Sequence, residues 1–448
     1  MNDLKQDPDY TLYRPIVEGN SKINWMIAFF VLVIIWATYM YVRQLIYGLS
    51  VTGMNNTVTW GFYIINFVFF IGISHAGTLI SAILRLSQAE WRRPITRMAE
   101  VITAIVLMIG GLHPIIDLGR PDRVLNVFYY GRLQSPLLWD VTAIGLYFTA
   151  STVYLYVPMI PDIALLRDRT KSKLKWLYNF LSWGYVGTPR QKHVLERAMS
   201  ILMVVVIPVA VSVHTVISYI FSMTLQSGWH STIFGPYFVT GAIFSGTATL
   251  LVVMIFFRKL FHLEEYLKEI HFQYMGILLL VFSLFWTYFT FSEYLTGIYG
   301  NEPMEMRVIH FKFTGPYAPY FWAMVICNFL IPLVILSFKK FKTIPGILTA
   351  GISVIIGMWL ERLIIIVPSL SNPRLPVVSQ PYIPSLTEWA LFAWGVSVFC
   401  LLFLIFSKIF PIISIWEIKE GREEGLQAAK GRLDSYLPDT TKIEEGVA

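Results

Sequence analysis

The chain has 448 residues, of which 56% are hydrophobic and 14% charged, and its net charge is +7. A soluble protein would have about a quarter charged residues, so the composition excludes a soluble globular protein and predicts an all-α protein that crosses a membrane many times. The positive charge does not indicate nucleic-acid binding, because the basic residues gather in loops on one side, and the two cysteines, Cys327 and Cys400, are too few for a disulfide framework or a four-cysteine metal site.

Ten apolar runs are long enough to cross a bilayer core of about 30 Å. In chain order they cover residues 24–48, 58–84, 97–118, 136–158, 197–224, 232–257, 271–296, 317–338, 344–367 and 386–410. The polar N-terminal segment, 1–23, lacks the features of a cleavable signal peptide. We therefore expect the first run to remain as a membrane span and residues 411–448 to form a charged cytoplasmic tail.

Basic residues divide the loops into two classes. The loops after the second, fourth, sixth and eighth runs are rich in Arg and Lys, whereas the alternate loops contain few. The positive-inside rule then places both termini and the basic loops in the cytoplasm. The loop after the third run faces outside in this orientation, which is the periplasm in a Gram-negative cell.

The two halves of the chain show a weak internal repeat. Residues 74–79 (SHAGTL) are similar to 245–250 (SGTATL), and Trp139 and Trp322 each follow a proline near the start of a run. The copies are four runs apart, so the repeat keeps its orientation, although coincidence among helices rich in small residues is the alternative. We expect two four-helix bundles related as a parallel repeat. The expected segments are 24–57 (first transmembrane helix), 58–224 (first bundle), 225–367 (second bundle) and 368–410 (last transmembrane helix).

Ionisable residues gather where the third run leaves the membrane, within residues 110–123. His113 and Asp117 are four residues apart and share one helix face. At about 1.5 Å per residue, His113 lies roughly 8 Å inside the outer end of its run, and Asp140 lies roughly 6 Å inside the next run from the same side. Ionisable groups at membrane depth are costly, so these are candidate functional residues.

Proline and glycine predict how this segment ends. Pro114 lacks a backbone N–H and should kink or end the helix. Gly119 is a plausible residue just beyond the helix end, and Pro121 a plausible first residue of a short following helix.

Four further ionisable residues lie within the runs. His75 and His214 are deeper, whereas Glu361 and Arg362 lie in the outer layer. Glu361 and Arg362 are sequence neighbours that point to different helix faces, so each is expected to need another partner.

An imidazole and a carboxylate in an apolar, outward-lying pocket suit a quinol headgroup. Quinol oxidation requires acceptance of two protons, which a histidine and an aspartate can provide. We expect His113 and Asp140 to face a common pocket as these acceptors. The chain has no C-x-x-C-H haem attachment and no cysteine cluster, so electrons would have to leave through a partner.

Several segments resemble the NrfD/PsrC family, the membrane subunits of polysulfide reductase and related complexes. The resemblance rests on residues 60–84 (WGFYIINFVFFIGISHAGTLISAIL), 90–93 (EWRR), 97–100 and 117–121 (DLGRP). The segment around His75 and the ten runs look most like the quinol-oxidising membrane subunits of alternative complex III, ActC and ActF. Many relatives have a histidine before Leu-Gly-Arg-Pro, where this chain has Asp117.

This resemblance implies an oxidoreductase subunit with menaquinone or ubiquinone as substrate at the periplasmic side. It implies that this chain itself binds no cofactor. The iron–sulfur clusters and haem c would lie on partners, namely a periplasmic iron–sulfur subunit and multihaem cytochromes c. A paralogous membrane subunit would be a further partner. It also implies a location in a bacterial inner membrane, whereas the coupling of turnover to proton translocation stays open from the sequence. It implies catalytic roles for His113, Asp140 and Asp117, quinone contacts that also include Arg120, and a proton path through His75, His214, Glu361 and Arg362.

Two other functions remain open from the sequence. A b-haem quinol oxidoreductase anchor would use His75 and His214 as axial ligands at similar depth. A secondary transporter built on the repeat would bind its solute near the midplane. The outward position of the polar layer disfavours the transporter.

Overall fold

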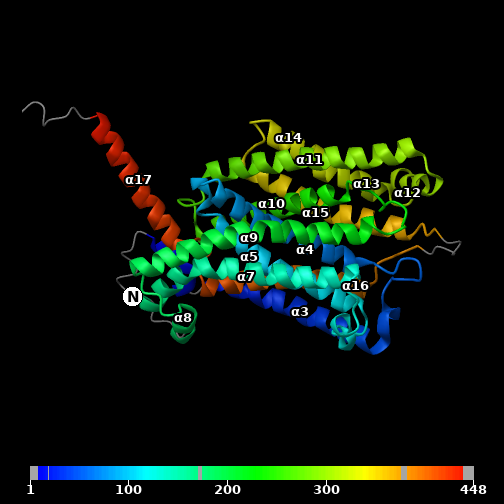
Figure 1. Cartoon of the computed structure of the whole chain (residues 1–448), viewed down its shortest axis with the longest axis horizontal. Coiled ribbons are helices and arrows are strands. Elements are labelled where there is room, and N and C mark those ends of the chain that lie inside the picture. The colour runs from blue at the N-terminus through cyan, green and yellow to red at the C-terminus, as the bar shows by residue number, and fades with distance from the viewer. Residues whose placement is uncertain (1–8, 19, 170–173, 375–380, 437–448) are drawn as a thin grey trace, which may run out of the picture.

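The computed structural model describes residues 9–18, 20–169, 174–374 and 381–436, and every regular element within them is helical. Ten helices in these ranges are long and apolar enough to cross a membrane. They run roughly side by side along the long axis of the molecule (Figure 1). The predicted polytopic all-α fold is confirmed.

The helices of membrane length lie close to the predicted runs. They are α3 (Ser21–Tyr47), α4 (Phe62–Leu86), α5 (Thr96–Asp117), α7 (Pro136–Arg169), α9 (Pro189–Ser222), α10 (Phe234–Phe261), α11 (Glu269–Gly300), α13 (Ala318–Val325) continued by η4 (Ile326–Leu330) and α14 (Ile331–Ser337), α15 (Ile344–Leu370) and α16 (Leu386–Ile409). Shorter helices are α2 (Tyr10–Val17), η1 (Gly48–Val51), η2 (Glu90–Arg92), η3 (Pro121–Arg123), α6 (Asn126–Tyr129), α8 (Lys175–Leu181), α12 (Pro303–Phe313) and α17 (Ile415–Tyr436).

Some helices extend well beyond the apolar runs. α7 continues to Arg169, and α9 begins at Pro189, several residues before its apolar run. A capping box explains the start of α9, because the Thr188 hydroxyl accepts from the backbone N–H of Gln191 at 3.3 Å. Hydropathy marks where a helix leaves the apolar layer, whereas capping marks where the helix ends.

The centre of the molecule is built around α4 and α10, which pack against each other and are the most enclosed of the long helices. α4 also packs on α5 and α9, α10 packs on α11 and α15, and α3 pairs with α16. The two helices approach closely beside the similar sequence segments, since a Cβ on Gly72 would lie 3.6 Å from Ser245 Oγ. Because α4 and α10 join the halves, the two-bundle division stays a prediction.

The eighth span contains a π-helical turn, η4, within a run of α-helix. Pro332, one turn later, has no N–H to donate to the carbonyl of Asn328. That carbonyl instead accepts the Ser283 hydroxyl of α11 at 2.6 Å. The backbone carbonyl left free by Pro332 is thus satisfied by a side chain of α11, which ties α11 to the eighth span.

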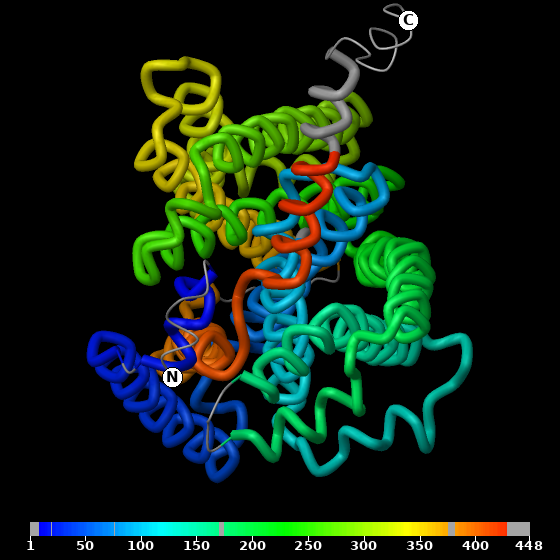
Figure 2. Tube along the Cα trace, turned by 90° about the vertical axis from the view of Figure 1, so that its left-hand side faces the viewer, coloured from blue at the N-terminus to red at the C-terminus, as the bar shows by residue number. Residues whose placement is uncertain are grey.

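The two ends of the molecule differ. The N-terminal helix and α17 lie at one end, whereas α12 lies at the other (Figure 1). The first end can be seen from outside in Figure 2, where α17 runs across the helix ends. We call it the charged end and its opposite the outer end. The two termini of the described chain therefore lie on the same side, as an even number of spans requires.

The predicted tail, 411–448, does not start as a surface segment. Residues 411–415 are buried, and Asp162 of α7 accepts from the backbone N–H groups of Ile415 and Trp416 at 3.2 and 3.0 Å. The predicted cytoplasmic tail therefore starts as a packed part of the helical body, because its backbone groups satisfy a buried carboxylate. Residues 437–448 lie outside the described residues.

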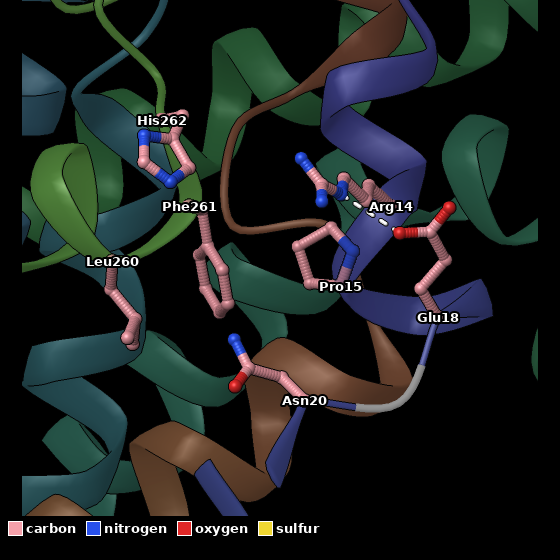
Figure 3. Close-up of a pocket in the computed structure, with 7 residues that line it drawn as sticks. All are labelled: Arg14, Pro15, Glu18, Asn20, Leu260, Phe261 and His262. Carbon is pink, nitrogen blue, oxygen red and sulfur yellow. Dashed lines mark hydrogen bonds and ion pairs between the residues drawn. The ribbon is translucent and has the colours of Figure 1, made fainter. Parts of the chain in front are cut away.

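A surface pocket of about 170 Å³ lies between α2 and the end of α10 (Figure 3). Arg14 and Glu18 form an ion pair of 2.9 Å at its rim, and His262 ends α10 in a left-handed conformation with φ 54°. The pocket lies at the charged end, away from the polar groups within the membrane layer, so it is not the candidate site.

Candidate functional site

His113 is completely buried near the outer end of α5. Its Nδ1 lies 2.9 Å from the carbonyl oxygen of Ile109. A carbonyl can only accept, so this bond places the proton of the neutral imidazole on Nδ1. Nε2 then carries a free lone pair, and it has no partner among the described residues. The ring packs against Phe70 of α4 and Trp394 of α16, with ring centroids 5.4 and 6.1 Å away.

Asp117 lies one turn beyond His113, and its Oδ1 has no partner among the described residues. It is close enough to Glu388 of α16 to interact electrostatically. The structure therefore brings His113 and Asp117 to the side of α5 that faces α4 and α16, in keeping with their spacing.

Asp140 is buried on α7, and its Oδ1 is also without a partner in the described chain. α7 faces the opposite side of α5, where a Cβ on Gly111 would lie 3.9 Å from Ile144, one turn after Asp140. His113 is two residues from Gly111, or about 200° around the helix. The structure does not bring His113 and Asp140 into one pocket, because equal depth does not fix the direction in which a side chain points.

Arg120 lies outside the buried region. Its guanidinium is 62% exposed and pairs with Asp122 at 2.9 Å. The chain reverses at Gly119, which has φ 64°, before η3 begins at Pro121. These two predicted end signals are confirmed, whereas α5 passes through Pro114 to Asp117 and does not end there.

Polar side chains that the sequence did not single out close the outer end beside α5. The Tyr63 hydroxyl donates to Gln44 Oε1 at 2.5 Å, and Gln44 Nε2 donates to the Ile116 carbonyl at 3.1 Å. The Tyr382 hydroxyl donates to Glu388 Oε1 at 2.5 Å. Burial and Glu388 raise the pKa of Tyr382, so its hydroxyl remains a donor. The sequence signal for this group was a polar residue inside the first span, Gln44, and another inside the last span, Glu388.

His75 and His214 meet in the membrane interior, with ring centroids 3.8 Å apart. His75 Nδ1 lies 2.9 Å from the Ile71 carbonyl, and Nε2 lies 2.8 Å from the Ala210 carbonyl. Both contacts are hydrogen bonds only when the imidazole carries two protons. Both nitrogens of His214 have no partner among the described residues.

This contact does not fit the b-haem alternative. Two axial imidazoles must approach the iron from opposite faces of a porphyrin, but the rings of His75 and His214 touch each other. Both nitrogens of His75 also face backbone carbonyls. The pair leaves no space for a porphyrin between the two rings, and His75 has no free nitrogen to bind the iron.

Glu361 and Arg362 are both buried on α15 and pair with each other, with Oε2 and Nη1 3.2 Å apart. The pairing of these two sequence neighbours was not expected, but each side chain also has the further partner that was predicted. Glu361 also accepts from Trp286 Nε1 at 2.6 Å. The Arg362 guanidinium lies 4.8 Å from the ring centroid of Phe238, which in turn is 6.4 Å from His214. The structure thus gathers the four predicted proton-path residues into one cluster.

A column of hydroxyl groups leads from this cluster towards the charged end. The column consists of the hydroxyl groups of Ser74, Thr78 and Ser81, and Arg85 lies at its end. These residues follow a 4-3-4 spacing and so share one face of α4. Ser74 Oγ lies 3.3 Å from His75 Nδ1. The spacing was visible in the sequence, but hydroxyl groups in an apolar run more often bond to their own helix, so they were not singled out.

Side chains of α5 and α7 continue the column. Glu100 accepts from the Ser81 hydroxyl at 2.6 Å, and Tyr154 lies 3.2 Å from the same hydroxyl. Thr78 and Ser151 are 3.5 Å apart. The column thus connects the interior histidines with a buried carboxylate near the charged end.

Buried ions at the charged end are paired. Arg97 of α5 forms an ion pair with Asp162 of α7. Glu417 of α17 pairs with Arg85 at 2.8 Å and Arg92 at 2.9 Å. Burial alone would raise the pKa of Glu417, but the two guanidinium groups hold it below its ordinary value of 4.5. These pairs fasten the C-terminal segment to α4, α5 and α7.

No group of three or more His, Cys, Asp or Glu side chains in the described ranges has the arrangement of a metal site. The candidate site itself consists of imidazole and carboxylate groups among apolar and aromatic side chains.

Comparisons with known proteins agree with this picture. The family model described as polysulphide reductase, NrfD, matches residues 50–373. A selenate reductase subunit of Mesobacillus selenatarsenatis is 26% identical over 390 residues, covering 82% of this chain and 89% of the relative. The Hdr-like menaquinol oxidoreductase integral membrane subunit of Archaeoglobus fulgidus is 24% identical, covering 91% and 98%. The menaquinone reductase integral membrane subunit of Nitratidesulfovibrio vulgaris is 23% identical, covering 88% and 92%.

The relatives named here are subunits of redox enzymes, and they are matched over most of their length. The closer likeness to alternative complex III stays a prediction. Because the family model covers well over half of the chain and the fold has ten membrane-length helices in its described residues, this chain belongs to the family described as polysulphide reductase, NrfD.

Proposed function

We propose that this chain is the quinol-binding subunit of a respiratory complex in the bacterial inner membrane. It oxidises menaquinol near the periplasmic side and passes electrons to an iron–sulfur subunit and multihaem cytochromes. The names of two relatives, which include menaquinol and menaquinone, support the substrate class.

The unpartnered Nε2 of His113 carries the proposal. Oxidation of a quinol to a quinone releases two electrons and two protons. Nε2 has the lone pair to accept the first proton, because the bond from Nδ1 to Ile109 fixes the tautomer. Asp117, one turn away, is the acceptor of the second, and both electrons go to the partner subunit. Asp140 remains a second candidate acceptor from the α7 side of the helix.

The interior cluster provides the proton path in this proposal. When His75 takes up a second proton, each of its two N–H groups donates to a backbone carbonyl. Both nitrogens of His214 are without a partner among the described residues and are available for proton exchange. Glu361 and Arg362 lie on the other side of Phe238. The path therefore connects the hydroxyl column of α4 with the outer half of α15, and it allows quinol turnover to be coupled to proton translocation.

Turnover of a menaquinol analogue by the purified complex tests the site. We expect His113→Ala and Asp117→Asn to lower kcat by about 10²- to 10⁴-fold, the usual effect of losing an acid–base group. Asp140→Asn tests whether the α7 side takes part. His193→Ala, an exposed histidine at the other end of the molecule, is the matched control and should retain full activity.

Assembly must be measured alongside turnover, by size-exclusion chromatography and by the haem and iron–sulfur content of the complex. A His113→Ala complex that assembles fully and oxidises quinol at the wild-type rate would remove His113 from the site. If all three site variants behave in this way, the proposed location of the site fails.

A further inference from the structure

A small cavity of about 40 Å³ lies at the outer end of the second half of the chain, between α10, α11 and α12. α11 contributes Thr290 and Glu293 to its wall, and α12 contributes Glu305 and Lys312. None of these residues belongs to the quinol site proposed above. A polar cavity that exceeds roughly 10–15 Å³ is large enough for an ordered water molecule.

Two buried side chains in this cavity lack the partners they need. Thr290 is only 8% exposed, and its hydroxyl has no hydrogen-bond partner among the described residues. Lys312 is only 4% exposed and forms no ion pair within 4.0 Å in the described chain. Its ammonium instead lies 5.6 Å from the ring centroid of Tyr294. Because an unsatisfied buried polar group is costly, water is the natural partner for both.

The groups around Lys312 set its charge. Glu293 and Tyr294 face it from α11 and Glu305 from its own helix, while Tyr237 of α10 lines the same cavity and α15 contributes the apolar Ile365. Burial lowers the pKa of Lys312 to about 8, although Glu293 and Glu305 act in the opposite direction. The amine can therefore gain and lose a proton near neutral pH.

The cavity connects inwards to Glu361. Trp286, Thr290, Glu293 and Gly297 follow the same 4-3-4 spacing as the hydroxyl column of α4, so they share one face of α11. Trp286 donates to Glu361 at 2.6 Å, one turn inside Thr290. Tyr237 lines the cavity and also interacts with Glu361.

The cavity also connects outwards. Glu293 accepts from the Ser231 hydroxyl at 2.6 Å. Ser231 in turn lines a surface groove of about 310 Å³ between the outer ends of α9 and α10, together with His230 and Met223, which are both exposed. This groove gives Glu293 a route to the outer solution.

We propose that this cavity is a hydrated proton-exchange site, in which water bound by Thr290, Glu293 and Lys312 joins Glu361 to the outer solution. A proton leaves the Glu361 carboxyl through the bound water, the Lys312 amine takes it up as an ammonium, and Glu293 and Ser231 pass it to the groove. No bond other than those to the proton changes. The outward direction rests on the proposed quinol function, but the hydration and the exchange do not.

Two measurements test this site. The first is an experimental structure of the complex at a resolution that shows water. Ordered water between Thr290 Oγ1, Glu293 and Lys312 is expected, and a dry cavity would overturn the proposal. The second is the pH dependence of infrared difference spectra between pH 6 and 9. An amine band that titrates near pH 8 in wild type should disappear in Lys312→Met, and its persistence would equally overturn the proposal.

Proton release during turnover gives the functional readout. In liposomes, Lys312→Met and Glu293→Gln should slow proton release to the outer side about tenfold, while KM for the quinol analogue is unchanged. Lys339→Met, an exposed lysine at the charged end, is the matched control. Wild-type release rates in both variants would overturn the exchange role. A wild-type complex that turns over no quinol would refute the proposed function alone, and the water map and infrared titration would still decide the cavity.

Discussion

The charged end and the membrane interior treat buried polar groups in opposite ways. At the charged end, Arg97 pairs with Asp162, and Glu417 pairs with Arg85 and Arg92. In the interior, one nitrogen of His113 and both nitrogens of His214 have no partner among the described residues. The charged end uses these ion pairs to join segments, whereas the interior leaves three imidazole nitrogens without a partner among the described residues.

The difference separates structural from functional residues on energetic grounds. Removing one member of a buried ion pair leaves an unpaired charge and is strongly destabilising. An unsatisfied buried donor or acceptor already costs about 1–3 kcal/mol in the native protein. Such a group is not retained for stability, so the interior histidines and aspartates are the candidates for quinol and proton chemistry.

The largest effect on stability is expected from Asp162→Ala. It leaves Arg97 buried without its counter-ion and frees the backbone N–H groups of Ile415 and Trp416. Loss of a buried partner should lower the free energy of unfolding by about 3–5 kcal/mol. Thermal unfolding and protease cleavage near residue 415 measure it. Asp168→Ala, an exposed carboxylate on the same helix, is the control and should cost less than about 1 kcal/mol.

Glu417→Gln should produce a smaller, pH-dependent effect. The folded pKa of Glu417 lies below its ordinary value of 4.5, so its stabilisation is fully present above pH 4.5 and is lost as pH falls through the folded pKa. Near pH 7 the substitution should lower the free energy of unfolding by about 2 kcal/mol, because it removes the charge from the bonds to Arg85 and Arg92. The wild type and the variant should converge in acid. A constant difference from pH 7 to pH 3 would contradict this pairing.

His214→Leu should affect turnover rather than stability, unlike the substitutions at the charged end. The imidazole makes no hydrogen bond within the described residues, and leucine is similar in size, so the melting temperature should stay the same or rise slightly. Proton-coupled turnover should nevertheless fall, because the exchangeable nitrogens are gone. A stability loss as large as that of Asp162→Ala would show that His214 is structural.

Arg120→Ala is expected to have the smallest effect. The side chain is 62% exposed and pairs with Asp122 in the turn after α5, so neither the melting temperature nor KM for quinol should change. An increase in KM would instead place Arg120 at the headgroup, as the sequence resemblance implied.

The sequence was sufficient for much of the fold. Span positions follow from hydropathy because the bilayer sets the length of an apolar helix. The chain reversal at Gly119 follows from its lack of a Cβ. Depth estimates also placed His75 and His214 near the middle of the membrane, where their rings meet.

The direction of side chains around each helix could not be predicted in the same way. His113 and Asp140 have similar estimated depths, but His113 contacts Trp394 of α16, whereas α7, which carries Asp140, packs near Gly111 on another face of α5. The docking of Glu417 was also not evident, because a charged segment after the last span shows nothing of the arginines it will contact. Lys312 was missed because a lysine in a short connecting helix is usually exposed.

The most direct test of the account is a single-turnover measurement of menaquinol oxidation by the intact complex carrying His113→Gln. The account predicts that the variant still binds quinol but transfers electrons at least about 100-fold more slowly, because Nε2 is the first proton acceptor. Wild-type electron transfer in a fully assembled His113→Gln complex would contradict the account.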